Sequence, residues 1–139
     1  MNESTPDKAL STADRLEIHE LAARYGTTID DRDWEGLEQV FCRDAVYELR
    51  GFGATDRRVV GSGEIRRMME ESQEHPVAHH VTNVLVTVES GEVRMRSKVI
   101  GPGARGRVGS ADYDDVLRRE DGAWRIATRL VTLRRPEPR

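Results

Sequence analysis

The residues whose types could do chemistry are concentrated at His79 and His80, which stand at the start of a strand-like segment ending at Val88. Successive side chains of a strand point to opposite faces, so only one of the two imidazoles can face a core. An imidazole that is held in a core and oriented by a carboxylate can accept and return a proton near neutral pH. The pair therefore indicates general acid–base chemistry, provided that the chain supplies a carboxylate and a cavity.

The partners that the chain offers are Tyr25, in a helical pattern, and Asp30, five residues later. A tyrosine can donate a hydrogen bond to an oxygen that gains negative charge, and an aspartate can fix the tautomer of an imidazole. Five helical residues turn through about 140°, so both side chains reach one cavity only if the helix ends or bends near Gly26. Simpler roles stay open: Tyr25 as a core aromatic, Asp30 as a cap, and the histidine as a hydrogen-bonded structural group.

Three other kinds of site find little support in the sequence. Residues 101–106 match G-x-G-x-x-G, but a dinucleotide site needs a helix directly afterwards, and the next segment alternates like a strand. The neighbouring histidines lack convergent ligands, so we expect no metal. The chain has no G-x-S-x-G motif, and its single cysteine, Cys42, suits buried packing better than nucleophilic attack. His19, on the charged side of its helix, is expected at the surface.

Length and composition limit the class of protein. A chain of 139 residues suits one domain with a real core. Its 22 basic and 25 acidic residues are mixed, with a net charge of −3, so we expect no nucleic-acid partner. The apolar runs fall far short of the roughly 20 residues that cross a bilayer, so we expect no membrane association. A single cysteine and a polar beginning predict a cytoplasmic location.

Helices are expected in the first half of the chain. Ser11 and Asp14 match a capping box, and the helix after them carries one apolar stripe. The stripe consists of Ile18, Ala22, Tyr25 and Ile29. Asp33 predicts the cap of a second helix that reaches Phe41. A strand is predicted over 45–49 and a third helix from Glu64 to about Glu74.

The second half alternates with a period of two, which predicts strands over 79–88, 92–100, 108–119 and 124–133. In the second of these, Ser97 shares one face with Val93, Met95 and Val99. Helices followed by antiparallel hairpins predict an α+β fold, in which a curved sheet wraps around the N-terminal helices as a cone. We expect one domain over 10–133, a disordered tail over 1–9 and a C-terminal tail over 134–139.

Several short motifs, in a specific order and spacing, resemble those of the SnoaL-like branch of the nuclear transport factor 2-like superfamily. The resemblance covers about residues 10 to 133. The motifs are Ile18-His19-Glu20-Leu21-Ala22-Ala23-Arg24-Tyr25, Asp30-Asp31-Arg32-Asp33-Trp34, Phe41-Cys42-Arg43-Asp44-Ala45, His79-His80-Val81-Thr82-Asn83, Tyr113-Asp114-Asp115 and Gly122-Ala123-Trp124-Arg125-Ile126.

Within the superfamily, the chain is similar to the scytalone dehydratases and the bile acid 7α-dehydratases. This resemblance implies an Asp–His pair, which falls on Asp30 and His80, and a helix tyrosine, which falls on Tyr25. Tyr47 would take the place of a second tyrosine. Both groups of enzymes carry another His or Asp on the following strand, where this chain has Ser97, so one proton-transferring group is missing.

The sequence therefore predicts a cofactor-independent lyase or isomerase, dehydratase- or cyclase-like, that acts on a small apolar cyclic or polyketide-like molecule. The catalytic candidates are Asp30, His80 and Tyr25, with His79 turned outward. The substrate-binding candidates are Tyr47, Ser97, Tyr113, Phe52 and Trp34. The alternative is a non-catalytic small-molecule-binding or assembly module, such as the β subunit of a ring-hydroxylating dioxygenase. The resemblance also implies a homodimer or homotrimer.

Overall fold

The computed structural model of the protein describes residues 10–73, 75–103 and 106–135. The tail predicted at 1–9 lies outside the described residues, as do residues 136–139 of the tail predicted at 134–139, whereas Arg134 is the last residue of β6. The helices are α1 (Thr12–Asp30), α2 (Trp34–Glu38) and α3 (Ser62–Glu71), with a 3-10 turn, η2 (Gly53–Thr55). The strands are β1 (Phe41–Arg50), β2 (Arg57–Val60), β3 (His80–Glu89), β4 (Glu92–Pro102), β5 (Val108–Glu120) and β6 (Ala123–Arg134).

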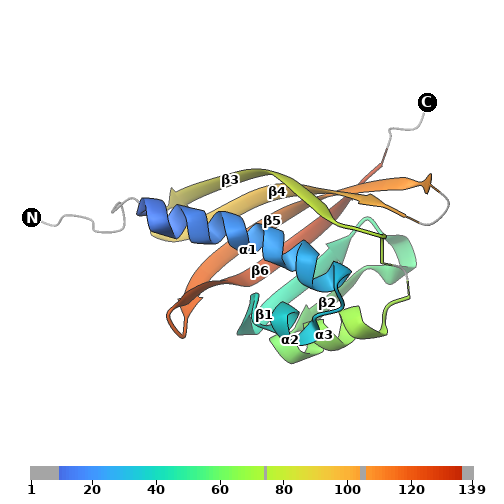
Figure 1. The fold of residues 1–139 in the computed structure, drawn as a ribbon, viewed down its shortest axis with the longest axis horizontal. Helices are drawn as coiled ribbons and strands as arrows, with labels where there is room; N and C mark the ends of the chain where they lie inside the picture. Colours follow the sequence, from blue (N-terminus) through green and yellow to red (C-terminus); the bar gives the residue numbers. More distant parts are fainter. Residues whose placement is uncertain (1–9, 74, 104–105, 136–139) are drawn as a thin grey trace, which may run out of the picture.

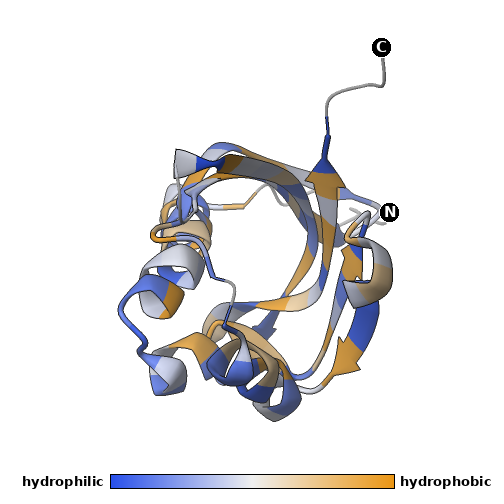
Figure 2. Cartoon of the chain, turned by 90° about the vertical axis from the view of Figure 1, so that its right-hand side faces the viewer, coloured by the Kyte–Doolittle hydropathy of each residue, from blue (hydrophilic) through white to orange (hydrophobic). Residues whose placement is uncertain are grey.

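The six strands form one sheet in the order β2-β1-β6-β5-β4-β3. Neighbouring strands are antiparallel except β1 and β6, which run parallel. The long strands curve over α1, and α2 and α3 lie beside β1 and β2 (Figure 1). In the view turned by 90° from Figure 1, the sheet curls around the interior without closing (Figure 2). The predicted α+β cone is therefore confirmed.

Helix α1 begins and packs as the sequence predicts. Ser11 and Asp14 exchange side chain–backbone hydrogen bonds in a capping box. The apolar stripe of Ile18, Ala22 and Ile29 is buried against the sheet. The helix continues to Asp30. The expected end or bend near Gly26 is wrong, and the orientation of Asp30 must be explained in another way.

The second helix is shorter than predicted, because the sheet takes over its last residues. Helix α2 ends at Glu38, and Phe41 is already the first residue of β1. Phe41 aligns with Ile126 of β6, and the Ile126 amide donates to the Val40 carbonyl at 2.9 Å. Helical spacing was a local signal here, whereas the parallel ladder with a distant strand decided the structure. Cys42, also in β1, is buried as predicted.

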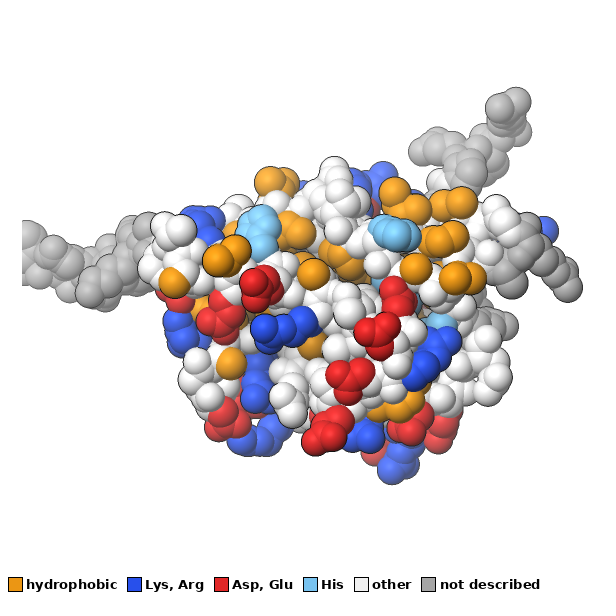
Figure 3. Space-filling view, viewed as in Figure 1, with side chains coloured by type: hydrophobic (Ala, Val, Ile, Leu, Met, Phe, Trp, Pro, Cys, Tyr) orange, Lys and Arg blue, Asp and Glu red, His pale blue; other side chains and the backbone are white. Residues whose placement is uncertain are grey.

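The remaining predicted strands are found, with ends that differ by one or two residues. The glycine-rich segment begins inside β4, at Gly101 and Pro102, and the next element along the described residues is the strand β5 rather than a helix. The face that carries α1 shows acidic and basic side chains interspersed (Figure 3). In the described part of the chain, no helix is both long and apolar enough to cross a membrane.

Candidate active site

The carboxylate of Asp30 binds His79 through both its ring and its backbone. Nδ1 of His79 lies 2.7 Å from Oδ1 of Asp30, and the His79 amide donates to both carboxylate oxygens, at 3.1 and 2.9 Å. The side chains are 8% and 21% exposed, respectively. Since a carboxylate only accepts hydrogen bonds, Nδ1 carries the proton and Nε2 presents a lone pair. The two residues, called the acid–base pair below, have the geometry of a positioned base.

The sequence assigned this role to His80, and the structure contradicts that assignment. His80 is exposed, whereas His79, expected to face outward, is turned in toward α1. The register of β3 with β4 shifts by one residue between Thr82 and Leu85, where Asn83 has a φ of 55°. This bulge reverses the alternation, because one extra residue moves every earlier side chain to the opposite face.

Gly26 brings α1 close enough to His79 for the pair to form. A Cβ at position 26 would lie 2.9 Å from the Cβ of His79 and 3.2 Å from its carbonyl oxygen. Only a residue without a side chain allows this approach, so Gly26 sets the distance between helix and strand. The Tyr25 ring then meets the His79 ring edge-on, with centroids 6.1 Å apart. His79 thus lies between Tyr25 and Asp30, which need no bend to share one site.

Burial lowers the pKa of His79 below its ordinary value, and the hydrogen bond and charge of Asp30 oppose that effect. The nearby charges of His75 and Arg129 also lower it. A lowered pKa keeps the imidazole neutral near pH 7, which is the state that can accept a proton.

Behind the acid–base pair, three tyrosines surround a buried arginine. The Cζ of Arg129 lies 4.2 Å from the ring centroid of Tyr25 and 4.0 Å from that of Tyr113. The hydroxyls of Tyr25 and Tyr47 are 2.7 Å apart. Asp115 receives two hydrogen bonds from Arg129, from Nε and Nη2, each 2.8 Å long. These residues, apart from Asp115, are called the aromatic–arginine cluster below.

The cluster combines neutral phenols with a permanent cation. Burial raises the pKa of Tyr25, Tyr47 and Tyr113 above the ordinary value, so all three keep their protons at neutral pH. Although burial disfavours the charge of Arg129, Asp115 raises its pKa, and the guanidinium stays protonated. Phenols near a cation can donate hydrogen bonds to an oxygen that becomes negative.

Two buried polar atoms in this region have no hydrogen-bond partner among the described residues: Oγ of Ser97 and Nη1 of Arg129. Both residues adjoin Tyr113, since Ser97 pairs with it across β4 and β5 and Arg129 lies over its ring. Buried polar atoms usually have partners, so these two atoms are exceptions within the described structure.

The other predicted binding residues are divided between this site and the rest of the molecule. Tyr47, Ser97 and Tyr113 are buried on the inner face of the sheet, as expected. Trp34 is half-buried, and its ring lies 6.1 Å from that of His75, a neighbour of His79. Phe52 packs against the core from the β1–β2 connection, and no described contact joins it to the acid–base pair.

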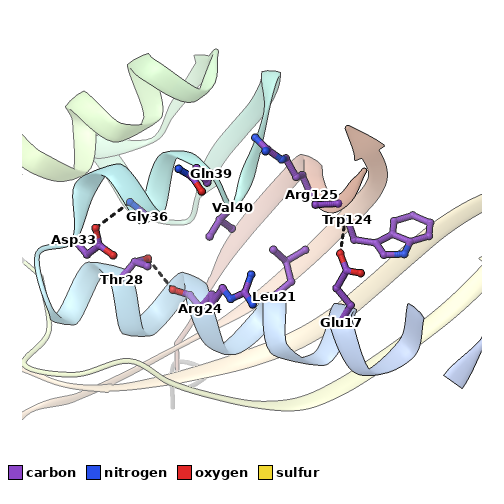
Figure 4. Close-up of a pocket in the computed structure, with 11 residues that line it drawn as sticks. Glu17, Leu21, Arg24, Thr28, Asp33, Gly36, Gln39, Val40, Trp124 and Arg125 are labelled. Carbon is purple, nitrogen blue, oxygen red and sulfur yellow. Dashed lines mark hydrogen bonds between the residues drawn. The ribbon is translucent and has the colours of Figure 1, made fainter. Parts of the chain in front are cut away.

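A cleft beside α1 lies away from the acid–base pair. It has a volume of about 400 Å³ and is bordered by α1, α2 and the start of β6, with Leu21, Val40 and Trp124 among its lining residues (Figure 4). The cone interior near His79 is instead filled by the tyrosine rings and Arg129. Acid–base chemistry at the histidine pair required a cavity beside the imidazole, whereas side chains fill this part of the cone densely and the filling is partly polar.

The sequence reasoning did not assign Arg129 or Asp115 to the site, and it named Gly26 only as a point where the helix could end or bend. Asp115 follows Tyr113 at the inward period of β5, and Arg129 precedes Val131 in the same way on β6. An acidic and a basic residue at inward positions of two successive strands were the sequence signal that could have indicated this buried ion pair. Among the described residues, no group of three His, Cys, Asp or Glu side chains could hold a metal ion.

Residues 11–130 match the model of the SnoaL-like domain family. The chain belongs to this family. An uncharacterised protein of Mycobacterium tuberculosis is 33% identical over 129 residues, which cover 86% of this chain and 85% of that protein.

Solved structures give the same fold. A Nostoc punctiforme protein of unknown function with a cystatin-like fold is 25% identical, with a TM-score of 0.77 over 90% of this chain and 94% of that one. A Novosphingobium aromaticivorans protein, provisionally named an aromatic ring hydroxylase, is 30% identical, with a TM-score of 0.74 over 91% and 93%. A hexachlorocyclohexane dehydrochlorinase from Novosphingobium barchaimii is 20% identical, with a TM-score of 0.69 over 87% and 86%, and shows the fold alone.

Proposed function

We propose that the protein is a cofactor-independent lyase or isomerase that removes a proton from carbon in a small, largely apolar molecule. The observation that carries this proposal is the hydrogen bond between Asp30 and Nδ1 of His79, which leaves Nε2 as a base. Neither a metal nor a cofactor is needed for a step of this kind when the carbon lies next to a carbonyl group.

In this proposal, Nε2 of His79 takes the proton from carbon, and Asp30 stabilises the imidazolium that forms. The electrons of the broken C–H bond move toward the substrate carbonyl, whose oxygen becomes negative. Tyr25, the phenol nearest the base, donates a hydrogen bond to that oxygen, and Arg129 supplies positive charge behind it. The proton then returns to another carbon, or a leaving group departs.

The shared fold is compatible with a reaction of this type. The name of the N. barchaimii protein describes an elimination, in which hydrogen and chloride leave neighbouring carbons. Elimination, isomerisation and cyclisation share their first requirement, a base positioned against a C–H bond. The same acid–base pair therefore serves any of them, and the substrate decides the outcome.

A second candidate is a non-catalytic binding or assembly module, and two observations favour it. The interior beside His79 is filled by side chains, and the Asp30 carboxylate binds the His79 backbone as well as its ring. In that case the pair is a clamp that fastens the start of β3 to α1. Activity and stability measurements on the same variants separate the two candidates.

The test uses 5-nitrobenzisoxazole, whose ring opens when a base removes one proton from carbon, releasing a coloured phenolate. We expect the wild-type protein to catalyse this opening and His79→Gln to lose about 100-fold or more, the usual contribution of a general base. His80→Gln is the matched control, because it changes the neighbouring exposed histidine and should keep the wild-type rate.

The clamp hypothesis makes the opposite prediction. Wild type, His79→Gln and His80→Gln would then react equally slowly, while His79→Gln would lower the melting temperature. Equal rates for wild type and His79→Gln would overturn the proposed function.

A further inference from the structure

The cleft beside α1 has the size and the lining of a small-molecule site. Its volume of about 400 Å³ lies within the usual range for such sites, which is about 300–1,000 Å³. Leu21 rises into the cleft from α1, and Val40 and Trp124 also line it (Figure 4). These three residues are called the apolar floor below. Gly36 and Ala123, which have little or no side chain, border the cleft and leave it open.

The two carboxylates that line this cleft already bind amides of the protein. Asp33 caps α2 and accepts a hydrogen bond of 3.0 Å from a backbone amide of that helix. Glu17 accepts one of 2.7 Å from the Trp124 amide. Figure 4 places these two acids toward opposite ends of the cleft, with Arg24 and Arg125 between them. Positively charged side chains therefore border the middle of the cleft.

Arg125 is a largely buried cation whose charge is weakly compensated. Its side chain is 19% exposed, and its buried Nε has no hydrogen-bond partner among the described residues. Nη1 lies 4.0 Å from the Glu120 carboxylate, which is too far for a hydrogen bond. Glu120 also accepts from the Arg43 amide at 3.0 Å and lies 3.6 Å from Arg118. Because a buried N–H without an acceptor is unfavourable, an anion beside Arg125 would stabilise it.

The charges nearest to Arg125 also favour an added anion. Arg118 lies opposite Arg125 in the ladder of β5 and β6, so the cross-strand neighbour is a second cation. Arg24 lies along α1 toward Leu21 and borders the same cleft (Figure 4). Its only recorded ion pair among the described residues is with Glu20, at 3.6 Å, and both side chains are more than half exposed. Since exposed pairs of this kind contribute little, Arg24 can turn toward an anion at low cost.

We infer that the cleft binds a small organic acid, whose carboxylate lies between Arg24 and Arg125 and whose apolar body lies against the apolar floor. A guanidinium matches a carboxylate in shape, because its N–H donors can form two parallel hydrogen bonds. The site is separate from the acid–base pair, and binding there requires no base at His79. A simpler role for Arg125 is to join the ion pairs around Glu120, and that role alone gives the cleft no preference for an anion.

The experiment compares octanoate with its neutral amide, octanamide, by isothermal titration calorimetry. The wild type should bind octanoate about tenfold or more tightly than octanamide, which is the usual gain from a hydrogen bond to a charged group. Arg125→Gln should remove this preference by weakening the binding of octanoate alone. Arg43→Gln is the matched control, because Arg43 lines the neighbouring hollow and not the cleft, and it should bind both ligands as the wild type does.

Three further variants test the rest of the site. Ala123→Leu places a side chain in the cleft and should weaken both ligands by similar factors. Arg24→Gln should weaken octanoate by only about twofold to fivefold, because this arginine is exposed. His79→Gln should bind octanoate as the wild type does, since the acid–base pair lies elsewhere. A protein that lacks the proposed activity and still binds octanoate in this way would leave the carboxylate site standing.

Amide NMR spectra locate the bound ligand. Octanoate should shift the signals of Gly36 and Ala123 more than the signal of His79, and the reverse order would overturn the site. No binding to the wild type, equal affinity for octanamide, or equal losses in Arg43→Gln and Arg125→Gln would also overturn it. Should Arg125→Gln fail to fold, Arg125→Lys replaces it. Lysine keeps the charge without the paired donors, so this variant should weaken octanoate and leave octanamide unchanged.

Discussion

The cone contains two pairs in which an acidic residue binds a basic one. The two pairs differ in burial and in how far apart their members lie along the chain. Asp115 and Arg129 are fully buried and face each other on adjacent strands, joined by two hydrogen bonds of 2.8 Å. Asp30 and His79 are partly exposed, and 49 residues separate them along the chain. The first pair is a permanent ion pair, whereas the second gains or loses its cation with pH.

This difference separates two tasks. A buried guanidinium that stays charged supplies a constant field to Tyr25 and Tyr113 but cannot exchange protons. A histidine near the surface, with its pKa below the ordinary value, can exchange protons and supplies little permanent charge. In the proposed reaction, the electrostatic stabilisation would therefore come from inside the cone and the proton transfer from its rim.

The largest expected effect comes from breaking the buried pair. Arg129→Met leaves the Asp115 carboxylate buried without a partner, which should lower the free energy of unfolding by about 3–5 kcal/mol. Chemical denaturation measures this change. The control is the double variant Arg129→Met with Asp115→Leu, which should be more stable than Arg129→Met alone. A single variant as stable as wild type would show that the pair is not essential to the fold.

A smaller effect is expected where the acid–base pair is assembled. Gly26→Ala brings a Cβ within 2.9 Å of His79, and crowding of this kind costs about 1–3 kcal/mol. The variant should also lose ring opening of 5-nitrobenzisoxazole, because α1 moves away from β3. Gly63→Ala in α3 is the matched control, since its Cβ would find Glu38 no closer than 3.8 Å, and its stability should change by less than about 1 kcal/mol. Equal behaviour of the two variants would contradict the role of Gly26.

The smallest effect concerns pH. Because the pKa of His79 is lowered in the folded protein, the unfolded chain takes up a proton first as the pH falls below about 6.5. Stability should therefore decline from that pH down to the folded pKa, and His79→Gln should decline less. Asp30→Asn removes a group that raises the pKa of His79, so the decline should extend to lower pH. Chemical denaturation of the wild type and both variants at a series of pH values measures these declines. Identical curves for the three proteins would show that titration of His79 does not cause the decline.

Much of the fold could be read from local patterns. The capping box at Ser11, the apolar stripe of α1 and the alternation of the four long strands all predicted elements that the structure contains. Phe41 shows the limit, because its helical spacing gave way to parallel pairing with β6. Local spacing cannot reveal a strand partner that lies about eighty residues further along the chain.

The candidate site, like the fold, was predictable from the sequence only where local patterns determine it. The sequence by itself identified Asp30, Tyr25, the histidine pair and the inward face of β4, because residue type and period are local properties. Only the tertiary structure decided that His79 rather than His80 meets Asp30, since one extra residue at Asn83 reverses the strand. It also decided that Gly26, Arg129 and His75 belong to the same region. Bulges, close approaches and buried ion pairs depend on what lies opposite in space, and no single segment of sequence carries that information.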